Sequence, residues 1–313
     1  MNKLKAVFMG TPDFAVPCLE KLLSLCDIVA VVTQPDRPKG RGQKLQPSPV
    51  KQFAQAAKLN ILQPEKIKTA EFVEVLKGFK PDLIVVVAFG QILSNEILAI
   101  PPLGCVNVHA SILPKYRGAA PIHWAIINGE SISGVTTMFM DAGLDTGDAI
   151  LTKSCNISQE MTTGELHDQL MIMGANLLEE TVELLAVDAA PRHPQNSDES
   201  SYAPLLKKST EKIDWSLAAA KIHDQVRGLN PWPGAYTTYN GQVMKIWQTK
   251  VVESVASYSD KPGQICQITP QGFTVATGDG ILEIIEIQPA SKRKMMAKDY
   301  VCGGKIITGD YLV

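Results

Sequence analysis

Hydrophobic positions in the first part of the chain follow two alternating spacings. Short apolar or β-branched runs have the length and composition of strands that are buried on both faces. These runs are residues 5–9, 28–33 and 83–87. Other segments place apolar side chains three or four residues apart, the spacing of a helix packed on one side. These segments are residues 15–25, 50–59 and 69–78. Strands alternating with helices predict an α/β domain with a doubly wound, mostly parallel sheet.

A further strand is predicted at residues 105–109, and its polar pattern sets it apart. Strand side chains alternate between faces, so Asn107 and His109 share one face while two valines occupy the other. Buried polar groups are costly unless they are paired, and open α/β sheets bind ligands where a strand meets a loop. Spacing alone leaves two interpretations open: a ligand site, or a hydrogen-bonded core histidine beside a turn-holding asparagine.

The rest of the chain divides into the end of this domain, a linker and a second domain. A helix is predicted at 121–128, a strand at 135–139 and a long covering helix at 165–186. Residues 189–204 are rich in proline and serine and lack apolar periodicity, which is typical of a linker. The predicted domains are residues 1–188 and 207–313, joined by a linker at 189–206.

The second domain is predicted to be a small barrel. One helix, at residues 217–229, precedes a series of short strands separated by glycine turns. The predicted strands are residues 235–239, 243–252, 263–269, 273–276 and 281–287. Five short strands of this kind suit a barrel of the OB type. In the segment NPWPGA we expect a rigid turn, with Trp232 packed in the core.

Composition narrows the class of protein. The 313 residues are 45% hydrophobic and 20% charged with a net charge of −2, a balance typical of a water-soluble globular protein. The six cysteines show no metal-ligand or disulfide spacing, so we expect reduced thiols and no metal site. We see no secretory signal and no apolar run of membrane length, and we expect a cytoplasmic protein.

A proline- and glycine-rich loop at residues 34–49 interrupts the α/β rhythm. It carries Lys39, Arg41 and Lys44 among its charges and contains one acid. Charged loops are commonly only solvated, but a long basic loop is also suited to contact phosphates. Residues 207–313 hold 13 Lys and Arg against 10 Asp and Glu, with one basic cluster beginning at Lys207. A solvated surface is the default interpretation of this cluster too, but the loop, the cluster and the predicted barrel together also suit a surface that faces RNA.

The motif that begins within the fourth strand resembles the signature of the folate-dependent formyltransferases. It reads Asn-x-His, then Ser-x-Leu-Pro, then Arg-Gly-Ala-x-Pro. The resemblance implies a catalytic set of Asn107, His109 and a later aspartate in the turn DAGLDTG. Spacing alone does not choose among Asp141, Asp145 and Asp148, but the family pattern selects Asp145.

The same resemblance implies the co-substrate and the residues that bind it. The formyl donor would be 10-formyltetrahydrofolate. Its expected contacts are Ser111, Ile112, Leu113 and Pro114 after the fourth strand, together with the backbone of Gln91 and Leu93. Neither a metal nor a covalent enzyme intermediate is needed for an amine to take the formyl group.

The basic loop and the second domain resemble family members that act on initiator methionyl-tRNA. This implies formyl transfer to the α-amino group of the methionyl ester in the bacterial cytoplasm, without a membrane partner, and we expect a monomer. Lys39, Arg41, Lys44 and Lys207 are the expected tRNA contacts. Two alternatives stay open: a formyltransferase or formyl-folate hydrolase with a small substrate, and an RNA-binding protein without activity.

Overall fold

The chain forms two compact units in a computed structural model that describes residues 3–39, 44–252 and 261–313. The first unit comprises Met1–Gly118, Ser133–Cys155 and His167–Ala203. The second comprises Ala119–Ile132, Asn156–Leu166 and Pro204–Val313, so two short segments join it before the main C-terminal part. The domain boundaries expected from the sequence follow a simpler division, and they stay a prediction.

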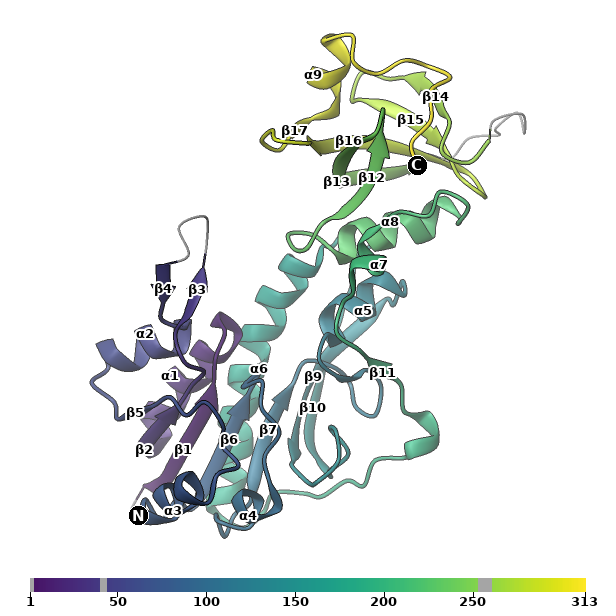
Figure 1. Ribbon diagram of the computed structural model, residues 1–313. Coiled ribbons are helices and arrows are strands. Elements are labelled where there is room, and N and C mark those ends of the chain that lie inside the picture. The colour runs from purple at the N-terminus through teal and green to yellow at the C-terminus, as the bar shows by residue number, and fades with distance from the viewer. Residues whose placement is uncertain (1–2, 40–43, 253–260) are drawn as a thin grey trace. The chain divides into compact units, whose positions relative to one another are not determined.

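The first unit is built on a seven-stranded sheet with the order β10-β9-β7-β6-β1-β2-β5. The bounds are β1 (Leu4–Gly10), β2 (Cys26–Val32), β5 (Ile61–Leu62), β6 (Leu83–Val87), β7 (Cys105–His109), β9 (Ile132–Phe139) and β10 (Ala149–Asn156). All neighbours from β7 to β5 are parallel, and β9 runs antiparallel to β7. The chain leaves β1 toward β2 and returns on the other side as β6, which confirms the doubly wound sheet (Figure 1).

Helices cover both faces of this sheet. One buried cluster joins β1, β2 and β6 to α3 (Ala70–Gly78) and α4 (Asn95–Leu98). On the other face lie α1 (Val16–Leu25) and the long α6 (Thr163–Ala186), tied by an ion pair of 2.6 Å between Lys21 and Glu179. A Cβ on Gly174 of α6 would lie 3.0 Å from Val108, so this helix packs closely on β7.

Side-chain alternation along β7 follows the sequence pattern. Cys105 belongs to the cluster beneath α3 and α4, whereas Val108 faces α6 on the other side. Asn107 and His109 therefore lie on the face of Cys105, as expected for a period of two. Both are buried, with 9% and 6% of their surface exposed.

The proline-rich loop contains more structure than the sequence indicated. β3 (Arg37–Lys39) and β4 (Lys44–Gln46) pair as a two-stranded antiparallel ribbon. The loop ends where Ser48 accepts a hydrogen bond of 3.1 Å from the Lys51 N–H, which begins α2 (Pro49–Ala56). A serine N-cap followed by proline is a strong helix start.

The segment expected to be a linker packs on the first unit over much of its length. β11 (Tyr202–Ala203) pairs in parallel with β8 (Arg117–Gly118), and His193 exchanges main-chain hydrogen bonds of 2.9 Å with Ala149. A 3-10 turn at Ser197–Glu199 lies between them. This segment has few apolar side chains, but it still packs on the first unit because its main-chain groups form hydrogen bonds there.

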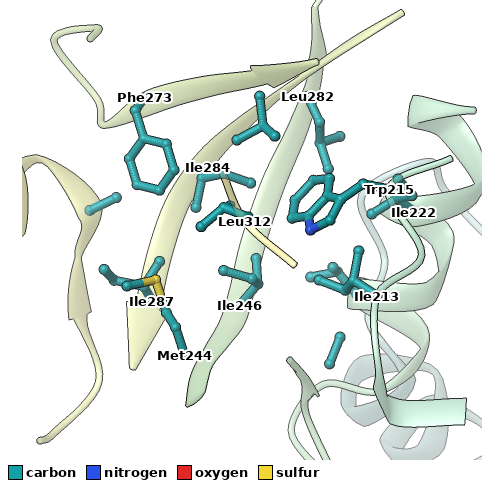
Figure 2. Packing of buried hydrophobic residues seen from close by; sticks show 14 of the residues in the cluster. Ile213, Trp215, Ile222, Met244, Ile246, Phe273, Leu282, Ile284, Ile287 and Leu312 are labelled. Carbon is teal, nitrogen blue, oxygen red and sulfur yellow. The ribbon is translucent and has the colours of Figure 1, made fainter. Parts of the chain in front are cut away.

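The second unit contains an antiparallel sheet with the order β12-β13-β16-β15-β14, and β17 pairs with β16. The bounds are β12 (Ala235–Tyr239), β13 (Gln242–Val252), β14 (Ile265–Ile268), β15 (Phe273–Ala276), β16 (Ile281–Pro289) and β17 (Met295–Met296). The helices are α5 (Pro121–Ile127), α7 (Lys208–Glu211), α8 (Ala219–Gly228) and α9 (Ala297–Cys302). Figure 2 shows the core, in which Trp215 and Ile222 meet the inward side chains of the strands.

The C-terminal residues connect the two edge strands of this sheet. Thr238 of β12 exchanges two main-chain hydrogen bonds with Val313, at 2.8 and 2.9 Å. Leu312 donates to the Gly263 carbonyl and Ile265 of β14 donates to Asp310, both at 2.8 Å. The sheet is thereby closed through the segment that ends the chain, which is consistent with an OB-like barrel.

Trp232 does not lie in the core, contrary to the expectation from the sequence. Its side chain is 67% exposed. Its ring is arranged edge-on to the His123 ring, with 6.3 Å between the two ring centroids. The turn itself is well held, because Asn230 donates to the Trp247 carbonyl and Lys245 to the Pro233 carbonyl. Helices of the described residues include none that is long and apolar enough to cross a membrane.

We expect Leu312→Ala to destabilise the second unit by about 2–5 kcal/mol, because it leaves a cavity at a side chain that is only 2% exposed. All four tryptophans, at 124, 215, 232 and 247, lie in this unit, so denaturant unfolding followed by tryptophan fluorescence reports on it. Val313→Ala is the matched control, since its side chain is 63% exposed. Equal losses in both variants would contradict the closing role of Leu312.

Candidate functional site

Loops that follow adjacent parallel strands are tied together at the carboxyl edge of the first unit's sheet. The Phe89 carbonyl, just after β6, accepts hydrogen bonds from Thr11 at 3.1 Å and from Gln34 at 3.2 Å. Thr11 follows β1 and Gln34 follows β2. One carbonyl therefore fixes three loops around the point where the strand order reverses, which is where such sheets bind ligands.

The three residues expected to be catalytic meet at the end of β7. Asp145 Oδ1 lies 3.5 Å from Asn107 Nδ2, and Asp145 Oδ2 lies 3.7 Å from His109 Nδ1. The Asp145 side chain is 14% exposed, so the carboxylate is largely withdrawn from solvent. A single acid thus faces both polar side chains of β7.

The other nitrogen of His109 is already committed. Nε2 lies 2.9 Å from the main-chain oxygen of Tyr116, and a carbonyl can only accept, so Nε2 carries the hydrogen. In the neutral ring Nδ1 is then a bare acceptor that faces a carboxylate. Nδ1 is therefore the ring nitrogen that is left for chemistry beside Asp145.

The three candidate acids in the loop after β9 have different partners. Asp141 Oδ1 accepts from the Gly143 N–H at 3.0 Å and from the Thr146 hydroxyl at 2.6 Å, so it holds the turn. Asp148 forms an ion pair with Arg192, with 3.5 Å between Asp148 Oδ2 and Arg192 Nη1. Asp145 alone of the three approaches Asn107 and His109.

The conformation of Asp145 depends on its neighbours. Its φ is 54°, in the left-handed region that aspartate tolerates better than most residues. Oδ2 accepts a hydrogen bond of 2.8 Å from the Gly118 N–H. A Cβ at Gly147 would collide with the Phe139 carbonyl, and one at Gly118 would lie 2.9 Å from the Ala203 carbonyl. Glycine at both positions lets the backbone pack closely around the acid.

The turn expected to bind folate is held by a threonine that the sequence did not single out. Thr136 of β9 lies opposite His109, donates to the Ser111 carbonyl at 2.8 Å and accepts from the Leu113 N–H at 3.2 Å. The Ser111 hydroxyl donates to the Lys115 carbonyl at 2.6 Å, and the Leu113–Pro114 bond is cis. Ile112 lies within this turn.

The loop after β6 presents backbone as well as side chains. Gln91 accepts the Ile67 N–H through its side chain at 3.1 Å, and Leu93 is buried in the core. Within the described chain, the main-chain N–H and C=O groups of Gln91 and Leu93 have no hydrogen-bond partner. Unpaired main-chain groups at a ligand-binding edge are suited to a flat, hydrogen-bonding ring.

The expected tRNA contacts are only partly described. Arg41 lies outside the described residues, and Lys39 and Lys44 pair through their main chains while their side chains lie outside the description. Lys207 is exposed in the second unit, at the residue before α7.

Two further residues near Asp145 escaped the sequence analysis. Arg117 is 2% exposed, and its guanidinium bonds to the Gln195 side chain, which in turn bonds to the Asp145 loop. Arg117 belongs to the Arg-Gly motif already noted. Gln195 had no signal, because it lies about fifty residues from the loop in a segment that resembles a linker.

Cysteine chemistry does not contribute to this site. Burial raises the pKa of the Cys105 thiol to about 12, so the thiol at the start of β7 stays protonated near neutral pH. The described residues hold no group of three or more His, Cys, Asp or Glu side chains arranged for a metal ion.

Comparison with known families accounts for nearly all of the chain. The formyl transferase model matches residues 4–182, and the formyl transferase C-terminal domain model matches residues 205–305. Curated proteins called methionyl-tRNA formyltransferase are similar over their whole length. One from Clostridioides difficile is 53% identical, over 98% of this chain and 99% of its own. One from Pelotomaculum thermopropionicum is 52% identical, over 96% of each.

Solved structures share the fold at low sequence identity. An N-formyltransferase from Helicobacter canadensis, in complex with folinic acid and dTDP-3-aminofucose, superposes with a TM-score of 0.67 at 22% identity, over 91% of this chain and 99% of its own. A sugar 3N-formyl transferase, in the presence of dTDP and 5-N-formyl-THF, gives 0.68 at 21% identity, over 94% and 100%. At this identity the likeness shows the fold alone.

Proposed function

The chain belongs to the formyl transferase family, and on that premise we propose that it transfers a formyl group from 10-formyltetrahydrofolate to the α-amino group of initiator methionyl-tRNA. The observation that carries the proposal is the meeting of Asn107, His109 and Asp145 at the end of β7. The names of the full-length relatives support the acceptor. We further propose that the chain acts as a monomer in the bacterial cytoplasm.

The reaction requires charge to be stabilised on one oxygen. The amine nitrogen attacks the formyl carbon, a new C–N bond forms, and negative charge develops on the formyl oxygen. The Asn107 amide is one donor for that oxygen, and the Nδ1–H of a protonated His109 is the other, because Nε2 is bound to the Tyr116 carbonyl and Nδ1 lies 3.7 Å from Asp145 Oδ2, too far for a hydrogen bond. The bond between the formyl carbon and the folate nitrogen then breaks, that nitrogen takes a proton, and the amine loses one.

Asp145 supports this chemistry in two ways. Its negative charge lies 3.7 Å from His109 Nδ1, where it attracts positive charge that develops on the ring during the reaction, and it accepts from the Gly118 N–H, which keeps it fixed. The proton lost by the amine passes to one member of this pair or to water. No step requires a covalent bond to the enzyme.

The residues present suit the formyl donor. The unpaired main-chain groups of Gln91 and Leu93 would hold the pterin ring, and the turn from Ser111 to Pro114 would flank it. When bound, the folate supplies the activated formyl group. The exposed side chain of Ile92, between the two backbone contacts, offers apolar surface beside the ring.

The deciding experiment supplies 10-formyltetrahydrofolate together with charged initiator tRNA. A dTDP-linked amino sugar is the control acceptor, because structures of the same fold carry such ligands. We expect formyl-methionyl-tRNA to form and the sugar to stay unmodified. Formylation of the sugar instead of the tRNA would contradict the proposed acceptor.

We expect His109→Ala to lower kcat by about 10²–10³-fold, the usual effect of losing one preorganised donor. His109→Gln is the second variant, because its amide can still donate to the Tyr116 carbonyl and preserve packing. Single-turnover formylation and thermal unfolding are measured together. A folded variant with kcat near that of the parent would remove His109 from the proposed set.

Asp145→Asn should reduce kcat much more than Asp141→Asn or Asp148→Asn. Asp145→Asn replaces the negative charge that faces His109 with a neutral amide. In Asp141→Asn, by contrast, the amide oxygen can still accept from Gly143 and Thr146. Steady-state rates of the three variants at saturating substrates decide this. Equal small losses would show that the acid has been wrongly assigned.

We propose that Lys39, Arg41, Lys44 and Lys207 contact the tRNA, Arg41 most closely because a guanidinium binds phosphate with paired hydrogen bonds. Arg41→Ala should weaken tRNA binding and flatten its dependence on salt by about 0.7–0.9 log units per log unit of salt for each phosphate that is no longer neutralised. Lys153→Ala, an exposed lysine on β10 at one edge of the sheet, is the charge-matched control. Identical slopes for Arg41→Ala and the parent would mean that the loop is merely solvated.

A further inference from the structure

Arg117 is a buried cation, and no acid of the described residues lies beside it. Its side chain is among the largest of the fully buried ones, and in the part of the chain that the structure describes no carboxylate lies within 4.0 Å of it. Buried charges are normally paired with an opposite charge, since desolvation is costly. Instead, Nε and Nη2 of Arg117 both donate to the Gln195 Oε1, at 3.1 and 2.8 Å.

The other end of the Gln195 amide binds the loop that carries Asp145. Its Nε2 donates to the main-chain oxygens of Asp145 at 2.9 Å and of Gly147 at 2.7 Å. The amide is therefore saturated, with two bonds accepted and two donated. The guanidinium polarises the amide, and this strengthens the donation to the loop, because hydrogen bonds in a chain reinforce one another.

The strand that contains Arg117 also holds the Asp145 side chain. Gly118, the next residue, donates its N–H to Asp145 Oδ2 at 2.8 Å, and the Arg117 N–H donates to the Ser201 carbonyl at 2.8 Å. β8 thus fixes the acid twice: directly at the carboxylate, and through Gln195 at the main chain. The two fixed points leave little freedom to a residue whose φ is in the left-handed region.

We propose that Arg117 and Gln195 are positioning residues for the reaction: they hold the Asp145 carboxylate toward His109 and Asn107. This inference rests on the proposed function, because it assigns the pair no contact with substrate. A purely structural role would be met by an apolar pair of similar volume, which fills the interior without the cost of a buried charge. The polar pair instead provides two hydrogen bonds from Gln195 Nε2 to the main chain of the loop that carries Asp145.

Gln195→Glu separates positioning from charge compensation. Glutamate gives Arg117 the carboxylate that it lacks, so the buried cation is better paired than in the parent. The same change removes both donors to the loop and turns an oxygen toward the Asp145 and Gly147 carbonyls, which repel it. We expect thermal stability to stay near that of the parent while kcat falls about 10²-fold, the order of loss that follows a misplaced catalytic group.

The split between kcat and KM provides the readout that stability alone would not move. At saturating 10-formyltetrahydrofolate and methionyl-tRNA, kcat should fall while both KM values change little, because the pair binds neither substrate. Arg117→Lys should give an intermediate loss, since one ammonium replaces a fork of two donors. Asn196→Ala, next to Gln195 but bonded only to Asp198 and Glu199, is the matched control and should leave kcat unchanged.

Each outcome is informative because the parent is measured in the same assay. A parent that formylates no methionyl-tRNA contradicts the proposed function itself. An active parent whose kcat is matched by folded Gln195→Glu and Arg117→Lys overturns the positioning role only. If Gln195→Glu unfolds, Gln195→Met and Arg117→Lys are measured, and parent-like kcat in both overturns it equally.

Discussion

The Asp145 carboxylate is the group on which the arrangement of the first unit's site depends. Its two oxygens face Asn107 and His109 from β7 and accept the N–H of Gly118 from β8. A carboxylate that is only 14% exposed needs such donors, since an unpaired buried charge is costly. β7, β8 and the loop of Asp145, which lies 38 residues after Asn107 and 27 after Gly118, are therefore brought to one point by the need to satisfy one acid.

Periodicity predicted the inner strands of the sheet because they are buried and largely apolar, but it did not predict the edge strands, since β5 has two residues and β10 is partly exposed. β6 and β7 were predicted with the bounds observed. The polar pair on β7 could also be recognised, because it breaks an otherwise apolar strand. Asp145 could not be chosen by spacing, and the prediction needed the family pattern. In the structure Asp145 faces Asn107 and His109, whereas Asp141 is bonded to Gly143 and Thr146.

Other features could not be predicted because they depend on contacts far apart in sequence. Gln195 acts across fifty residues on the Asp145 carbonyl, and Thr136 acts on the Ser111 turn across twenty-five. Neither leaves a local pattern, and the serine- and proline-rich composition around Gln195 suggested a linker. A rigid turn with Trp232 packed in the core was one interpretation of the segment NPWPGA, but Trp232 is exposed, and Trp215 and Trp247 are the buried tryptophans.

Closure of the second unit's sheet has a consequence for self-association. Without residues 310–313, the main-chain N–H and C=O of Thr238 in β12 and the N–H of Ile265 in β14 would be left unpaired at the two edges of the sheet, and free strand edges are the template on which strands of separate chains pair. Docking joins Thr238 to a partner 75 residues away, so the closure is a non-local one. We expect that a weakened closing segment would expose these groups to pairing with a second molecule, because free strand edges are the usual template for association.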